Sequence, residues 1–171
     1  MKNLLASFIA FAFFFVGNAW SHPLDTDPAS TIDAGATITA ERDLNLPANL
    51  MLFLQNGGLL RFDASFSVKD AYCALAAFNA NQEAFNRDLV IAKGSVFTLV
   101  SNELKSSDHE KGGDFAFYNR FKFGTPGGNS LVLECLSSGS WASYRVPLVG
   151  DVRRSIERAF ALKFAEPVQL N

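Results

Sequence analysis

Leu131-Val132-Leu133-Glu134-Cys135-Leu136 is a run of five apolar residues and one glutamate between two groups of turn-forming residues, at positions 126–129 and 137–140. A short apolar run bounded by Gly, Pro, Asn and Ser is typical of a β-strand buried in a core. Residues 141–146 are expected to return as its partner strand. The run also carries Cys135, one of the two cysteines of the chain, so this strand determines where a covalent cross-link can form.

The other cysteine, Cys73, lies in a segment with two readings. Alanines recur through residues 71–85 and suit a helix, whereas Tyr72-Cys73-Ala74-Leu75 suits a strand that places Cys73 opposite Cys135. We favour a strand over residues 71–78. Neither cysteine belongs to a CxxC motif or a Cys/His cluster, so one disulfide is expected in an oxidising compartment, with two buried free thiols as the alternative.

A β-hairpin is predicted around Gln55-Asn56-Gly57-Gly58. This tetrapeptide separates an apolar run at residues 49–54 from another at residues 59–62. An Asn-Gly pair between such runs is the strongest local signal for a hairpin, because both residues tolerate the positive φ angles of a tight turn.

Further strands and one helix are predicted by hydrophobic periodicity. Residues 95–100 are rich in β-branched and aromatic side chains, and residues 115–123 alternate phenylalanine with smaller or polar neighbours. Asp151 is expected to cap a short helix, and residues 160–164 to form a last strand. The fold class is therefore mainly β, an antiparallel β-sandwich or barrel with one short C-terminal helix and one disulfide.

The N-terminus has the pattern of a secretory signal. Met1-Lys2-Asn3 carries one positive charge and is followed by an uncharged apolar run over residues 4–17. That run is too short to span a bilayer, which requires about 20 apolar residues. We expect residues 1–21 to be removed after Ser21, with cleavage after Ala19 as the alternative, so that the mature chain is periplasmic or extracellular and lacks a membrane span.

The mature chain is expected to comprise a flexible leader and one domain. Residues 22–37 are rich in Pro, Asp, Ala, Ser and Thr and offer little apolar surface to bury, so we predict a flexible leader there. From residue 38 the composition changes, and residues 38–171 are predicted to form a single β-rich domain.

The charge pattern excludes one class of partner. The 171 residues include 15 Lys or Arg and 17 Asp or Glu, for a formal net charge of −2 at pH 7. The basic residues are scattered, so no patch is expected that would neutralise a row of phosphates. Nucleic acid is not an expected partner.

Motifs for catalysis are missing from the sequence. The chain has no GxSxG elbow, and Asp63, Asp70, Glu103 and Glu134 show no spacing that selects a pair of carboxylates. His109 lies in a polar, glycine-containing stretch with three carboxylates, which suits either a solvated loop or a divalent metal. No catalytic residue is assigned, and the protein is expected not to be an enzyme.

The position of His22 suggests an alternative function. Cleavage after Ser21 would place the His22 imidazole beside the new amino group, and His109 would add a third nitrogen. This arrangement resembles the copper-binding histidine brace of lytic polysaccharide monooxygenases and of CopC-like copper carriers, which are also secreted β-sandwiches. The resemblance implies a copper-binding carrier or oxidase that uses His22 and His109 as ligands.

The sequence thus favours a secreted or periplasmic, non-catalytic binding module without a cofactor. Its expected partner is a protein, a glycan or an envelope component, bound through loops or through an aromatic strip at residues 115–123. The copper protein is one alternative. A secreted protease inhibitor, with residues 105–113 as its exposed loop, is another.

Overall fold

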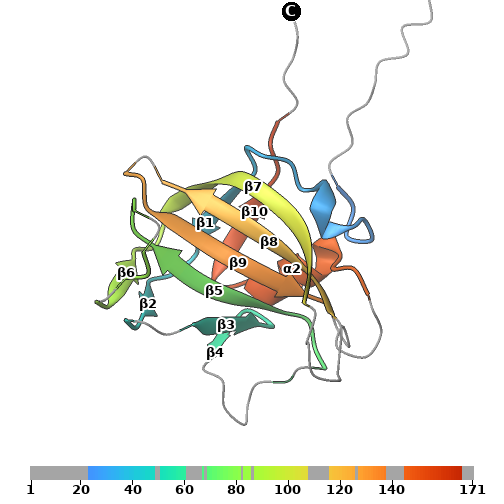
Figure 1. The fold of residues 1–171 in the computed structure, drawn as a ribbon, viewed down its shortest axis with the longest axis horizontal. Coiled ribbons are helices and arrows are strands. Elements are labelled where there is room, and N and C mark those ends of the chain that lie inside the picture. The colour runs from blue at the N-terminus through green and yellow to red at the C-terminus, as the bar shows by residue number, and fades with distance from the viewer. Residues whose placement is uncertain are drawn as a thin grey trace, which may run out of the picture.

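A computed structural model describes residues 23–48, 51–60, 67, 69–81, 83–85, 87–107, 116–125, 127–137 and 145–166. The elements follow one another along the chain as shown in Figure 1: η1 (Ala29–Thr31), β1 (Thr37–Ala40), β2 (Leu44–Leu46), β3 (Leu52–Gln55), β4 (Gly58–Leu60), β5 (Tyr72–Phe78), β6 (Leu89–Ile91), β7 (Val96–Ser107), β8 (Ala116–Gly124), β9 (Ser130–Leu136), α2 (Val149–Ile156) and β10 (Phe160–Lys163).

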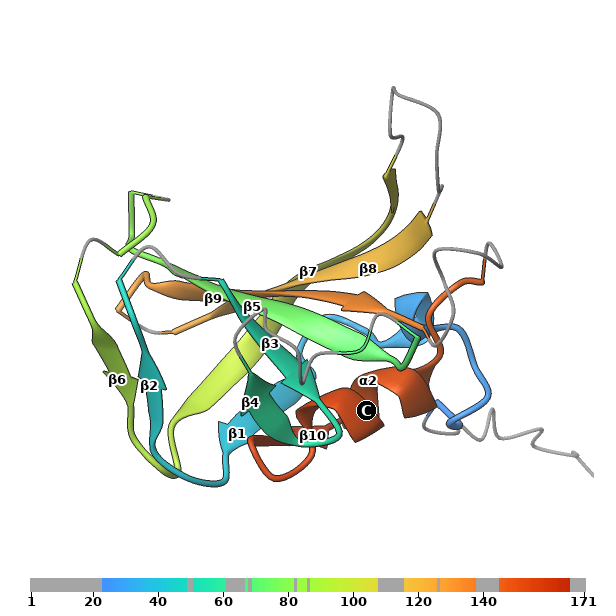
Figure 2. The same ribbon diagram turned by 90° about the horizontal axis from the view of Figure 1, so that it is seen from below.

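The strands form two antiparallel sheets. The large sheet has eight strands in the order β10-β1-β7-β8-β9-β5-β3-β4, and β2 pairs with β6 in a separate ribbon. The large sheet curls strongly, so that β1 and β10 lie beneath β5 and β9, and α2 lies under the concave side (Figure 2). This half-barrel confirms the predicted mainly β, antiparallel fold class.

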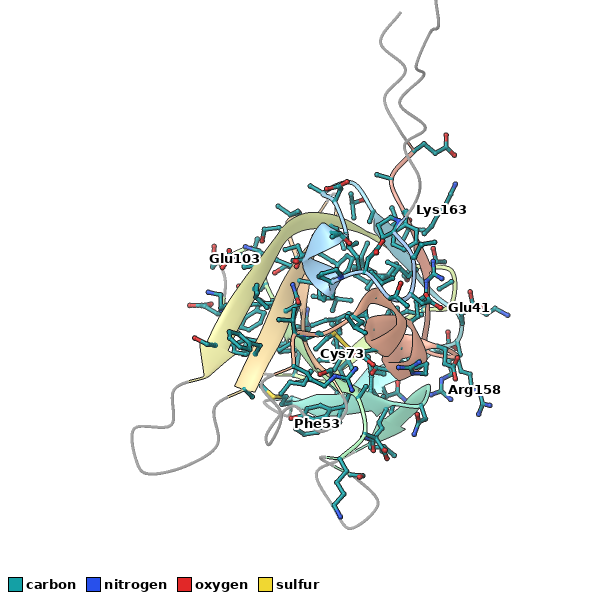
Figure 3. All side chains as sticks on the ribbon, turned by 90° about the vertical axis from the view of Figure 1, so that its right-hand side faces the viewer. Glu41, Phe53, Cys73, Glu103, Arg158 and Lys163 are labelled. Atoms are coloured by element: carbon teal, nitrogen blue, oxygen red, sulfur yellow. A yellow bond between two sulfur atoms is a disulfide. The ribbon has the colours of Figure 1, made fainter. Side chains whose placement is uncertain are left out.

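The predicted disulfide is present and joins two neighbouring strands. Cys73 of β5 lies directly opposite Cys135 of β9, and the two sulfur atoms are bonded across 62 positions of sequence (Figure 3). The segment around Cys73 is a strand, as we favoured. Cys73, Leu75, Leu133 and Cys135 point to the concave side and belong to the main hydrophobic core.

The predicted hairpin forms and its turn docks on α2. Gln55 pairs with Gly58, which leaves Asn56 and Gly57 as a two-residue loop with φ angles of 49° and 73°. The Gly57 N–H donates to the Ser155 carbonyl of α2. A Cβ at Gly57 would lie 2.1 Å from the Glu157 carbonyl oxygen, so this approach requires glycine.

The segment expected to be a flexible leader departs from that expectation over its described part. Ala29, Ile32 and Ala36 are buried in the main core. The Ala29 N–H donates to the Pro147 carbonyl at 2.7 Å. The amino-acid composition did not indicate that this segment packs on the domain, because each small alanine buries little area. The segment is held instead by backbone hydrogen bonds that satisfy polar groups of the domain.

The C-terminal helix begins earlier than its sequence suggests. Leu148, not Asp151, is the N-cap residue, and Asp151 lies in the first turn, where its carboxylate accepts from the Leu148 N–H at 3.2 Å. The Val149 and Gly150 N–H groups donate to the carbonyls of Asp27 and Asp25. The N-terminal segment therefore caps α2 through tertiary contacts, which no local pattern reveals.

Four of the remaining strand predictions are confirmed, and one is not. Strands near residues 95–100, 115–123, 131–136 and 160–164 are confirmed as β7, β8, β9 and β10. Of the strand expected at residues 141–146, positions 141–144 lie outside the described residues, and Arg145 and Val146 are not in a strand.

Removing the disulfide should destabilise the fold substantially. A cross-link that closes 62 residues is expected to contribute about 4 kcal/mol by restricting the unfolded chain. The double variant Cys73→Ala/Cys135→Ala should therefore lose a few kcal/mol of unfolding free energy in urea titrations. The unfolded, unreduced wild type should show no free thiol, and detection of two would contradict the bond.

Gly57→Ala should be far more destabilising than Gly94→Ala. Both glycines have positive φ, 73° and 83°, so each substitution incurs about 1–2 kcal/mol of backbone strain. Gly94 has no neighbouring atom within 4 Å of an added Cβ, whereas Gly57 meets a backbone carbonyl. We expect Gly57→Ala to cost at least about 2 kcal/mol more in chemical denaturation. Equal losses would show that the hairpin does not dock tightly on α2.

Candidate ligand-binding cleft

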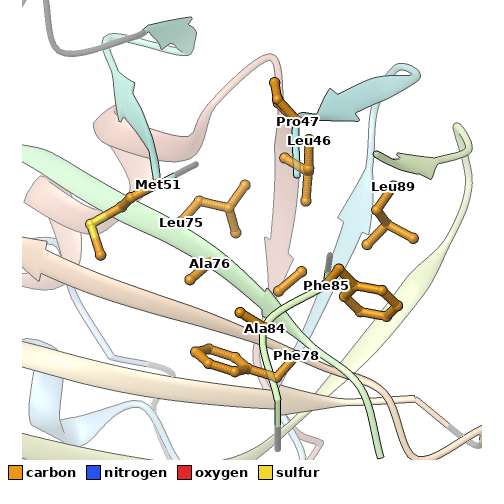
Figure 4. Close-up of a pocket in the computed structure, with 10 residues that line it drawn as sticks. Leu46, Pro47, Met51, Leu75, Ala76, Phe78, Ala84, Phe85 and Leu89 are labelled. Atoms are coloured by element: carbon orange, nitrogen blue, oxygen red, sulfur yellow. The ribbon is translucent and has the colours of Figure 1, made fainter. Parts of the chain in front are cut away.

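An apolar cleft of about 300 Å³ lies between β5 and the β2–β6 ribbon (Figure 4). All ten described residues that line it are apolar. They come from β5, from the loop that follows β5, from the β2–β6 ribbon and the residue after β2, and from the residue before β3: Leu75, Ala76, Ala77, Phe78, Ala84, Phe85, Leu46, Leu89, Pro47 and Met51.

The cleft lies where the described pairing of β5 with β3 ends. β3 pairs with β5 only opposite Cys73, Ala74 and Leu75. Beyond Leu75, the edge of β5 on that side meets only an isolated bridge between Phe78 and Ala84 within the described residues. The β2–β6 ribbon belongs to a separate sheet and faces this edge. Side chains, not backbone hydrogen bonds, therefore line the space between the ribbon and β5.

Polar contacts outside the cleft hold its walls. The Asn79 side-chain oxygen accepts from the N–H groups of Asn81 and Glu83, which fixes the turn after β5. On the opposite wall, the Asp88 carboxylate accepts from the Ala48 N–H at 2.9 Å. The side chains of Asn79 and Asp88 thus hold the two walls from outside, and the side chains that line the cleft are apolar.

The cleft has a buried floor and an exposed entrance. Leu75 is 1% exposed and Leu46 is 6% exposed, whereas Met51 is 50% exposed. A flexible, polarizable methionine at an entrance adapts to ligands of different shape. The volume lies at the lower end of the range for small-molecule sites, about 300–1,000 Å³. Such a cleft suits a small uncharged apolar molecule.

The outer face of the large sheet carries a row of alternating charges. Arg120 of β8 lies opposite Glu103 of β7 on one side and opposite Glu134 of β9 on the other. Arg120 pairs with Glu134 at 3.5 Å, and Lys105 pairs with Glu103 at 3.0 Å. The pKa of Glu103 is lowered because Lys105 donates a hydrogen bond to its carboxylate and adds a nearby positive charge.

Both described carboxylates of this charge row, Glu103 and Glu134, lie beside a cation. They are two of the four carboxylates considered from the sequence. Asp70 is exposed in the loop before β5, and Asp63 lies outside the described residues. A depression of about 280 Å³ lies over this face and is bordered by Lys105, Arg120 and Lys122 among others.

The predicted metal ligands cannot be placed, because His22 and His109 both lie outside the described residues. Among the residues that the structure does describe, no group of three or more His, Cys, Asp or Glu side chains is arranged to hold a metal ion. The inhibitor loop proposed at residues 105–113 is described only up to Ser107. The predicted pair Cys73 and Cys135 is the disulfide.

The aromatic strip proposed at residues 115–123 is not an open surface. Phe121 and Phe123 are 1% and 2% exposed and belong to the main core. Phe117 and Tyr118 are half-buried, and Phe115 lies outside the described residues. The alternation of phenylalanine with smaller residues along β8 therefore reflects packing of Phe121 and Phe123 in the core.

No local pattern in the sequence indicates the apolar cleft. Its lining is drawn from segments that are distant in sequence, and each residue alone is an ordinary apolar residue of a strand or loop. The only local hint is the pair of small residues, Ala76 and Ala77, at the end of a strand, where larger side chains would have closed the space.

The fold and the cleft together define a curved antiparallel β half-barrel with an apolar, ligand-sized cavity at its open seam. No helix in the described part of the chain is long and apolar enough to span a membrane. Comparison of the chain with models of protein families, with curated proteins and with solved structures gave no match.

Proposed function

We propose that this protein is an exported, non-catalytic binding protein that holds a small uncharged apolar molecule in the cleft between β5 and the β2–β6 ribbon. The observation that carries the proposal is a cleft of about 300 Å³ whose described lining residues all have apolar side chains. Burial of apolar ligand surface supplies the affinity, because each Å² removed from water contributes about 25 cal/mol.

Export is supported by the N-terminal sequence and by the disulfide. The charged start and the uncharged apolar run over residues 4–17 have the pattern of a secretory signal. The Cys73–Cys135 bond is of the kind that persists in oxidising compartments. An envelope or extracellular location would give the cleft access to apolar compounds outside the cytoplasm.

The absence of catalysis in the proposal rests on the chemistry of the cleft walls. No acid, base or nucleophile is among the ten lining residues. Glu103 and Glu134 lie on the outer face of the sheet, where they form ion pairs with Lys105 and Arg120. A ligand in the cleft would be held and released unchanged.

Met51→Asp should weaken binding of an apolar fluorescent probe at least about tenfold, because a charge at the entrance must be desolvated when the probe enters. The measurement is fluorescence titration of the processed protein with N-phenyl-1-naphthylamine. Ala84→Trp, which places an indole in the cleft from an exposed position, should also reduce binding.

Leu24→Asp is the matched control. Leu24 is an exposed aliphatic residue, 64% exposed against 50% for Met51, and it does not line the cleft. Its substitution should leave probe affinity unchanged. No probe binding by the wild type, or equal losses for Met51→Asp and Leu24→Asp, would refute the proposed cleft.

A further inference from the structure

Among the residues that the structure describes, the outer edge of β7 has no strand partner along half of its length. β1 pairs with β7 only opposite Val96, Phe97 and Thr98. The Leu99 backbone continues this contact, donating to the Ala36 carbonyl and accepting from the Gly35 N–H. From Ser101 to Ser106, β7 has β8 on one side and no strand neighbour on the other within the described residues.

The start of this edge is held in place by hydrogen bonds of Asn102 to the N-terminal segment and to β8. Asn102 donates from its side-chain nitrogen to the carbonyls of Ala29 and Ile32, at 2.9 and 3.0 Å. Its side-chain oxygen accepts from Asn119 of β8 at 2.9 Å. The start of the edge is therefore fixed relative to both its sheet neighbour and the N-terminal segment, and little ordering would be needed before a partner strand binds.

The side chains on the edge are self-complementary in charge. Glu103 and Lys105 point to the same face of the sheet and lie at its margin, with exposed fractions of 56% and 36%. Leu104 lies between them and is 44% exposed. Figure 3 shows Glu103 at the outer side of β7, away from the core around Cys73. A lysine on an edge strand normally opposes edge-to-edge pairing, but a glutamate opposite it reverses this effect.

Only one antiparallel register matches these charges with a second copy of the same strand. A two-fold axis at Leu104 places Glu103 opposite Lys105 of the other copy, and Lys105 opposite its Glu103. A two-fold axis at Glu103 would place glutamate opposite glutamate, and an axis at Lys105 would place lysine opposite lysine. Like charges directly opposite each other on a sheet are destabilising.

We propose that the protein forms a two-fold symmetric homodimer in which the β7 edges, residues 102–106, pair antiparallel with Leu104 at the axis. The two large sheets then continue into one another across the interface. Main-chain hydrogen bonds supply the affinity and the Glu103–Lys105 pairs select the register. The interface is independent of the proposed cleft, which is lined by residues of other elements.

The test is sedimentation equilibrium of the processed protein at concentrations from about 1 µM to about 1 mM, a range that detects weak dimers. The wild type should show concentration-dependent dimers. Glu103→Lys and Lys105→Glu should each weaken dimerisation at least about tenfold, because each places two like-charged pairs across the axis. Lys93→Glu makes the same charge change as Lys105→Glu at an exposed position outside the edge, and this control should dimerise like the wild type.

A mixture of the Glu103→Lys and Lys105→Glu variants tests the proposed register directly. A Glu103→Lys chain opposite a Lys105→Glu chain has lysine facing glutamate at both positions, so the mixture should form heterodimers although neither variant dimerises well alone. In addition, Leu104→Cys should cross-link two copies under oxidising conditions. A monomeric wild type, dimers of the single variants as strong as those of the wild type, or a mixture that fails to associate would each overturn the proposal.

Discussion

The pairing of β5 with β9 is the constraint on which the rest of the structure depends. Seven residues of each strand lie in register, and the Cys73–Cys135 bond joins them in the middle of the core. These strands link the two halves of the large sheet, because β8 and β7 follow β9 on one side and β3 and β4 follow β5 on the other. The curvature of the sheet then brings β1, β10 and α2 against the same inward-facing side chains.

The second organising contact is the capping of α2 by distant segments. Its first N–H groups donate to the carbonyls of Asp25 and Asp27, and Arg153 pairs with Asp25 at 2.9 Å. At the other end, the Gly57 turn donates to Ser155. A helix of two turns has little intrinsic stability, so these contacts from both ends, together with its buried apolar face, account for its presence.

The cleft and the free edge of β7 have a common structural origin in unequal strand lengths. β3 covers three residues of β5, and β1 covers three residues of the longer β7. Where the shorter neighbour ends, the longer strand continues without a strand neighbour on that side, as far as the described residues show. At β5 the unpaired part faces the apolar β2–β6 ribbon and a cavity results. At β7 the unpaired part faces outward and carries Glu103 and Lys105. The same mismatch thus produces an apolar site at one place and a charged edge at another.

Local sequence patterns are sufficient to predict the Asn56-Gly57 turn, the alternating strands and the pairing of the two cysteines. They misjudge the N-terminal segment and the start of α2, because both depend on backbone hydrogen bonds between residues more than a hundred positions apart. Only the tertiary structure decided where strand pairing ends, since pairing length depends on sheet curvature and on which neighbour is available. The cleft and the β7 edge are therefore properties of the assembled sheet, built from residues that are unremarkable in the linear chain.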